Sequence, residues 1–98
     1  MRLNPERFGY ALVSFIQLRL RPEAKRQQAA DFLSARPEIL EVHFITGEDC
    51  FLVKTRTSGT DQLNGLLQEL AASITCFRDS KTFVVLATHK ETAQIPLD

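Results

Sequence analysis

The sequence predicts a single α+β domain, residues 1–98, with the element order strand, helix, strand, strand, helix, strand. Two observations predict this order. Four stretches have patterns typical of strands, either alternating apolar and polar residues or many β-branched and aromatic residues. They lie near residues 10–20, 39–46, 50–56 and 81–88. Apolar residues at helical spacing fill the two longer intervals. Short connections and right-handed crossovers then favour a four-stranded antiparallel sheet with both helices on one face, the ferredoxin-like arrangement.

The first strand is expected over residues 10–20, where Ile16, Leu18 and Leu20 alternate with polar residues. Its first half is apolar on both faces, with Val13 and Phe15 opposite Ile16. Two helices cover only one face of such a sheet, and monomers rarely expose an apolar patch larger than a few hundred Å². A second copy of the chain is therefore expected on the helix-free face, which predicts at least a homodimer.

The first helix is expected to begin at Pro22, because proline suits the first helical turn and Glu23 favours the same end. It should end before Pro37, since the residue preceding a proline avoids the helical region. Two strands, residues 39–46 and 50–56, then form a hairpin with Gly47 at its turn.

The second helix is expected to start near Ser58 and Asp61, which have capping-box spacing, or with Thr60 as its cap. Its core stripe is Leu63, Leu66, Leu67 and Leu70. Gly65 is interpreted as a site where the helix approaches the sheet closely. The last strand, residues 81–88, should place Phe83, Val85 and Ala87 opposite Val84 and Leu86.

The hairpin turn combines several kinds of polar group that could contact a ligand. Thr46 supplies a hydroxyl, Glu48 and Asp49 supply carboxylates, and Gly47 leaves backbone N–H groups accessible. This mixture beside an apolar sheet could hold a small zwitterion. A solvated hairpin tip is the simpler alternative.

The composition excludes several classes. Twelve basic and twelve acidic residues cancel, which argues against nucleic-acid binding by this chain. No apolar run reaches the roughly 18 residues of a membrane span, and the N-terminus lacks a signal-peptide core. Cys50 and Cys76 have no paired spacing and are expected to be reduced. We expect a soluble, cytoplasmic protein with neither metal nor cofactor.

Several stretches, taken together, resemble one family. These are the entry segment at residues 3–10, the strand and turn at 41–48, the strand at 51–54, the strand at 80–86 and the ending at 95–97. Their order is similar to the effector-responsive C-terminal domain of the Lrp/AsnC transcription regulators, also called the regulation-of-amino-acid-metabolism domain. The chain has no helix-turn-helix, so it is expected to be either an excised fragment or a stand-alone member. The linker-like residues 1–9 favour a fragment.

The resemblance implies a non-enzymatic domain that senses an amino acid or other small effector. It also implies assembly as a homodimer and, as in many family members, as a ring of four dimers. Direct DNA or membrane binding is not expected. Effector binding would shift assembly by its different affinity for two oligomeric states. The positions that match family effector positions are Thr46, Gly47, Glu48, Asp49, Cys50, Thr60, Ser80, Thr82, Val84 and Val85.

Two departures from the family pattern bear on this site. Many members have an aspartate where this chain has Cys50, and Asp49 lies one residue earlier. The Pro-Gly-Val that often precedes the last strand is replaced by Thr75, Cys76 and Phe77, so a differently shaped loop is expected.

Two other classes of function remain as alternatives. A small dimeric ferredoxin-like enzyme, of the monooxygenase or isomerase kind, would need a histidine or acid in an enclosed pocket. His43, His89 and Cys50 have no supporting local pattern for catalysis, and Cys50 is expected to be a packed residue. An RNA-binding sheet domain would need exposed aromatic residues and a basic face. Lys25, Arg26 and Lys54 are expected to be ordinary solvated charges.

Overall fold

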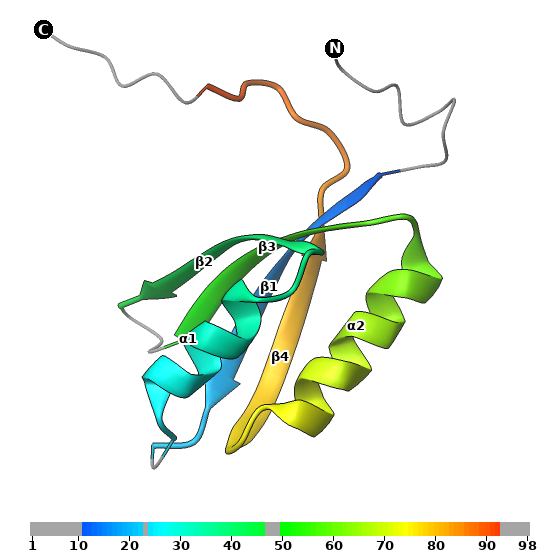
Figure 1. The fold of residues 1–98 in the computed structure, drawn as a ribbon. Coiled ribbons are helices and arrows are strands. Elements are labelled where there is room, and N and C mark those ends of the chain that lie inside the picture. The colour runs from blue at the N-terminus through cyan, green and yellow to red at the C-terminus, as the bar shows by residue number, and fades with distance from the viewer. Residues whose placement is uncertain (1–10, 23, 47–49, 93–98) are drawn as a thin grey trace, which may run out of the picture.

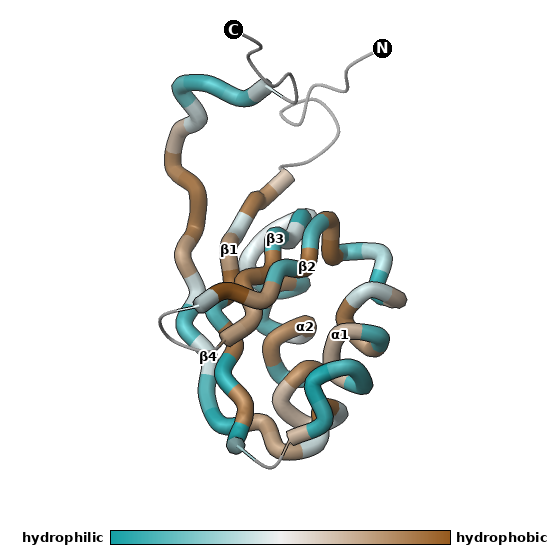
Figure 2. Tube along the Cα trace, turned by 90° about the vertical axis from the view of Figure 1, so that its left-hand side faces the viewer, coloured by the Kyte–Doolittle hydropathy of each residue, from teal (hydrophilic) through white to brown (hydrophobic). Residues whose placement is uncertain are grey.

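The elements of the computed structural model follow the predicted order (Figure 1). The structure describes residues 11–22, 24–46 and 50–92. Its elements are β1 (Leu12–Leu20), α1 (Arg26–Ser34), β2 (Ile39–Ile45), β3 (Cys50–Thr57), α2 (Thr60–Ser73) and β4 (Phe77–Val84). The strands pair antiparallel in the order β2-β3-β1-β4. Both helices lie on the same side of the sheet (Figures 1 and 2), which confirms the ferredoxin-like fold.

The core lies between this side of the sheet and the helices. Ile16 and Leu18 on β1 and Val53 on β3 have no exposed surface, and Leu33 of α1 and Leu70 of α2 pack in the same cluster. Burying one such side chain fully contributes about 1.5–3 kcal/mol. Side chains alternate along a strand, so Val13 and Phe15 lie on the opposite, helix-free face.

The last strand lies four residues earlier than predicted. It covers Phe77–Val84 instead of residues 81–88, and its pairing with β1 runs from Phe77, opposite Leu20, to Val84, opposite Ser14. One further bond joins the Val85 amide to the Val13 carbonyl at 2.9 Å. The predicted start of the first strand at Tyr10 lies outside the described residues.

The prediction that Pro22 begins the first helix is wrong. The Arg21 amide donates to the Cys76 carbonyl at 2.8 Å, which ties the chain to the end of the sheet. The Ala24 amide then donates to the Arg21 carbonyl at 3.0 Å, so Pro22 lies in a turn and α1 begins at Arg26. Glu23 lies outside the described residues. The predicted end before Pro37 is confirmed.

The start of α2 also differs from the prediction. Its N-cap is Gly59, so neither Thr60 nor the pair Ser58 and Asp61 forms the expected cap. The side chain of Gln62 reaches back instead and accepts a hydrogen bond from the Ser58 amide at 2.6 Å. The apolar stripe is confirmed: Leu63, Leu66 and Leu70 are buried and Leu67 is half-buried.

The loop before β4 contains a backbone conformation that usually belongs to glycine. Cys76 has φ of 65°, in the left-handed region, where a Cβ costs roughly 1–2 kcal/mol. Its carbonyl accepts the Arg21 amide, so this loop is joined to the end of β1. Cys50 and Cys76 are both free thiols. No helix in the described ranges is long and apolar enough to cross a membrane.

The interpretation of Gly65 as a close-packing site is wrong, because Gly65 is exposed and a Cβ there would meet no atom within 4 Å. Gly65→Ala should therefore raise the free energy of unfolding by about 1 kcal/mol, the difference in helix propensity. Urea unfolding at one fixed protein concentration measures this change. Gly59→Ala is the matched control: it also meets no atom, but at an N-cap it should give no gain. An unchanged or lower midpoint for Gly65→Ala would contradict the prediction.

Candidate functional site

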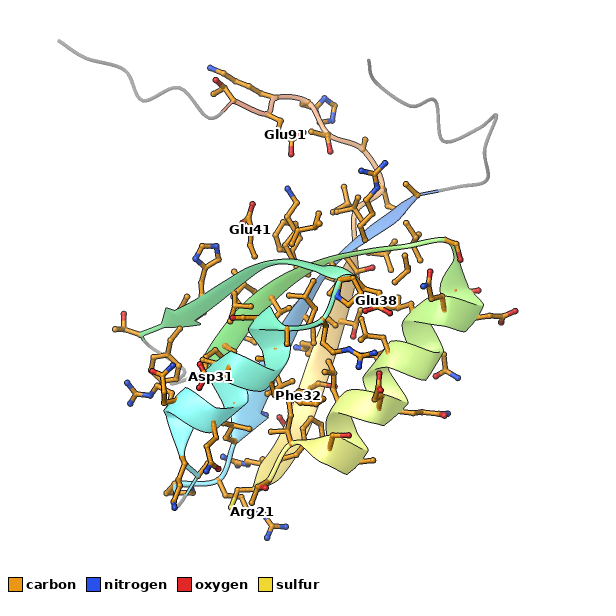
Figure 3. All side chains as sticks on the ribbon, viewed as in Figure 1. Arg21, Asp31, Phe32, Glu38, Glu41 and Glu91 are labelled. Carbon is orange, nitrogen blue, oxygen red and sulfur yellow. The ribbon has the colours of Figure 1, made fainter. Side chains whose placement is uncertain are left out.

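A cavity opens at the end of the sheet where β1 leads into α1 and β3 begins. Its volume is about 390 Å³, within the range of small-molecule sites. The lining combines basic side chains with apolar and aromatic ones: Arg19, Leu20, Arg21, Pro22, Ala24, Arg26, Phe44, Cys50, Phe51 and Arg78. Figure 3 shows Arg21 at this end of the molecule, below the sheet.

The aromatic part of the lining is built by the hairpin. Phe51 is buried, and the Phe44 ring meets it edge-on, with centroids 5.3 Å apart and planes at 74°. Phe44 is 39% exposed, and the Arg26 guanidinium lies 3.9 Å from the centre of its ring. A cation over an aromatic ring is attracted by about 0.5–1 kcal/mol at exposed sites. The expectation that Arg26 is an ordinary solvated charge is therefore wrong, because α1 places it against the cavity wall.

A two-point ion pair joins β1 to β4 beside the cavity. Arg19 donates from Nε to Oδ1 of Asp79 at 2.8 Å and from Nη2 to Oδ2 at 2.9 Å. These hydrogen bonds, and the nearby Arg19 and Arg78 charges, hold the pKa of Asp79 below its ordinary value. Arg78 lies farther away, with its Nε 4.0 Å from Oδ2. Asp79 thus compensates mainly Arg19.

The described hairpin positions matched by resemblance, Thr46 and Cys50, lie at this end of the sheet. Thr46 and Cys50 flank the turn, and Gly47, Glu48 and Asp49 lie outside the described residues. Cys50 lines the cavity and is only 1% exposed, which confirms its prediction as a packed residue.

The remaining matched positions lie elsewhere within one protomer. Thr60 begins α2, which follows the end of β3 opposite to Cys50 (Figure 1). The eight residues of β3 separate the two ends by roughly 20 Å. Ser80, Thr82 and Val84 stand opposite Leu18, Ile16 and Ser14 of β1, so they are on the helix side of the edge strand β4. Val85 bonds to Val13 through its amide. One chain therefore does not bring the matched positions into a single pocket.

The residues that sequence reasoning missed are the arginines of the cavity. Arg19 and Arg21 are two residues apart at the end of β1, but Arg26 and Arg78 come from α1 and β4. Only the antiparallel pairing of β1 with β4 places Arg78 near Arg19 and Arg21. The usable signal in the sequence was the pair of arginines at the end of the first strand.

A second charged group lies on the helix-free face. Lys54 is also not an ordinary solvated charge: its side chain is 18% exposed, and its Nζ lies 3.1 Å from Glu91 and 3.8 Å from Glu41. His43 Nε2 lies 3.1 Å from Glu41, and this hydrogen bond is the largest cause of the lowered pKa of Glu41. Figure 3 shows Glu41 and Glu91 facing this region. His43 is exposed and does not line the cavity.

A family model described as the Lrp/AsnC ligand binding domain matches residues 13–95. The chain is 37% identical over 95 residues to the HTH-type transcriptional regulator FL11 of Pyrococcus horikoshii. It is 31% identical over 93 residues to the proline dehydrogenase transcriptional activator of Rhizobium radiobacter. These alignments cover 97% and 92% of the chain but only 62% and 59% of the relatives, so the chain spans about three fifths of their length.

Solved structures share the fold. A transcriptional regulator of Neisseria meningitidis, in complex with L-methionine, superimposes with a TM-score of 0.84 at 26% identity. That match covers 98% of this chain and 63% of the regulator. AsnC of E. coli gives a TM-score of 0.83 at 22% identity and covers 98% of this chain and 64% of its own.

The Arg19–Asp79 pair predicts a pH-dependent contribution to stability. Because the pKa of Asp79 is lowered, the pair stabilises the fold above the ordinary value of 3.8, and this contribution is lost as pH falls through the lowered pKa. Asp79→Asn should lower the urea midpoint at neutral pH, and the gap to the wild type should close on acidification below that value. A gap that does not change with pH would show that the ion pair is not its cause.

Proposed function

Because the chain belongs to the Lrp/AsnC ligand-binding domain family, we propose that it is the amino-acid-sensing and oligomerisation domain of a transcription regulator. In this proposal the chain has no enzyme activity, and any DNA binding belongs to a helix-turn-helix domain outside these 98 residues. Its balanced charge of twelve basic and twelve acidic residues supports the last point.

The observation that carries the proposal is a cavity of ligand size at the hairpin end of the sheet, in a chain of a ligand-binding family. Phe44 and Phe51 offer apolar surface there, and the arginines offer partners for a carboxylate. The Neisseria relative was solved with L-methionine, which supports an amino acid as the class of effector. The enzyme alternative lacks comparable support, because His43 lies exposed on the surface.

Assembly follows from the helix-free face of the sheet. Phe15 stands opposite Phe83 of β4, and the alternation places Val13 and Leu52 on the same face. Phe83 is 50% exposed. Apolar side chains gathered on one uncovered face favour a second copy of the chain as its cover, and hence a homodimer.

The described part of the segment after β4, residues 85–92, does not take the place of that second copy. It runs on the side of the sheet away from the helices (Figure 2) and touches this face through the ion pair between Glu91 and Lys54. Leu86 is 96% exposed and Phe83 remains half exposed, so the described part of the segment leaves the apolar patch open.

The separation of the matched positions within one protomer also favours assembly. Thr60 and the hairpin turn can contribute to one effector site only if they come from different copies. We therefore propose that the effector binds between protomers around Thr46, Gly47, Glu48, Asp49 and Cys50. Thr60, Ser80, Thr82, Val84 and Val85 would come from another copy. Assembly beyond the dimer, as a ring of four dimers, belongs to the same proposal.

Substitution on the helix-free face tests the dimer. Phe83→Glu should shift the chain to a monomer in size-exclusion chromatography with light scattering, because a buried unpaired carboxylate is costly at an apolar interface. Ala71→Glu adds the same charge on the exposed surface of α2 and should leave the dimer intact. A monomeric wild type, or a Phe83→Glu chain that stays dimeric, would contradict this use of the face.

Thermal unfolding with each standard amino acid tests the sensing function. A ligand at 100 times its dissociation constant should add about 2.7 kcal/mol to the free energy of unfolding. For a domain of this size that is a rise in Tm of roughly 10 °C or more. The D-enantiomer of each active amino acid serves as its control. If none of them changes Tm or the oligomeric state, amino-acid sensing is wrong and a purely structural assembly domain remains.

A further inference from the structure

We infer that the cavity at the hairpin end of the sheet selects a small dicarboxylate, so that the effector of this chain is an acidic amino acid. This inference rests on the proposed function, because it names the chemical class of the ligand. The hairpin residues that match the family's effector positions do not by themselves indicate an acidic ligand. This class of ligand follows from the basic side chains that the fold gathers around the cavity.

The charges of the described lining residues are not balanced. Arg19 is compensated by Asp79 through two short hydrogen bonds. Arg21 forms no ion pair within the described part of the chain, and Arg26 is held over Phe44 instead of beside an acid. Arg78 reaches the same Asp79 only at 4.0 Å. Within the described lining, Arg21, Arg26 and Arg78 thus have no close carboxylate of their own, because Asp79 binds Arg19 and Arg78 lies 4.0 Å from it.

Guanidinium groups are well suited to binding carboxylates. Each presents a planar fork of N–H donors that can bind both oxygens of a carboxylate. Arg21, Arg26 and Arg78 approach the cavity from three different parts of the chain: the residue after β1, the start of α1 and the start of β4. Donors that converge from separate directions match a ligand with two acid groups better than a ligand with one.

The remaining lining suits the short hydrocarbon part of such a ligand. Phe51 and Cys50 are buried at the base of the cavity, and Phe44 and Leu20 add apolar surface. A volume of about 390 Å³ is near the lower end of the range for ligand sites, which favours a small molecule.

Three acidic residues are sequence neighbours of residues that line the cavity. Their charges determine which class of ligand is the main alternative to a dicarboxylate. Glu23 follows Pro22, and Glu48 and Asp49 precede Cys50; these three lie outside the described residues. If their charges compensate the arginines, the cavity would prefer a zwitterion without net charge, such as methionine. Aspartate against methionine is therefore the comparison that decides between the two.

Isothermal titration calorimetry with the 98-residue chain tests the inference, using aspartate, glutamate, succinate, methionine, arginine and inorganic phosphate as probes. We expect aspartate or glutamate to bind at least about tenfold more tightly than methionine, since a hydrogen bond to a charged group contributes about 1.5 kcal/mol or more. Methionine binding as tightly as the acids would overturn the inference but leave amino-acid sensing in place. Succinate binding as tightly as aspartate would support the dicarboxylate site and count against amino-acid sensing.

Two further outcomes would overturn the inference. One is binding of phosphate without any dicarboxylate. The other is the absence of binding by every probe, which would also remove the sensing function.

Single-charge variants assign the binding to the cavity. Arg21→Gln, Arg26→Gln and Arg78→Gln should each weaken aspartate binding by about tenfold and should affect methionine binding less. Lys25→Gln is the matched control, because Lys25 is the neighbour of Arg26 but lines a different, smaller cavity. Arg21 and Arg26 are exposed, so these variants should keep the far-UV circular dichroism of the wild type. If the arginine variants and Lys25→Gln bind aspartate with equal affinity, the assignment of binding to this cavity is wrong.

Discussion

The pairing of β1 with both β3 and β4 is the constraint on which the rest of this structure depends. Ile16 and Leu18 stand opposite Val53 and Phe51 on one side and opposite Thr82 and Ser80 on the other. A slip of one residue would turn the buried side chains of β1 to the helix-free face. The register is therefore fixed by the burial of Ile16 and Leu18, and it determines both faces of the sheet together.

Two consequences follow at opposite parts of the molecule. On the helix-free face the same register puts Phe15 beside Phe83, and so produces the apolar patch that we assign to dimerisation. At the end of β1 it puts Arg19 beside Asp79. The chain must leave the sheet there to begin α1, and the turn at Pro22 brings α1 back so that Arg26 reaches Phe44. The interface and the cavity are thus products of one strand register.

Most of the fold was predictable because local patterns carry it. Strand alternation and the leucine stripe of α2 depend only on residues close in sequence, and both are confirmed. The misplaced boundaries depend on distant partners. Pro22 does not begin a helix because the Arg21 amide is held by Cys76, and the bounds of β4 are those of its pairing with β1, from Phe77 opposite Leu20 to Val84 opposite Ser14. Gly65 was misread because helical spacing alone does not say how closely a helix approaches a sheet.

The candidate site shows the same division. By itself the sequence determined the fold class, the apolar character of both sheet faces and the resemblance that the family match then confirmed. These properties follow from periodicity and from short ordered stretches of residues. Only the tertiary structure decided that Arg21, Arg26 and Arg78 share one cavity and that Thr60 and Cys50 lie toward opposite ends of β3. The reason is physical: contacts between residues more than 50 positions apart, such as Arg19 with Asp79, are set by strand order and register, which no local pattern encodes.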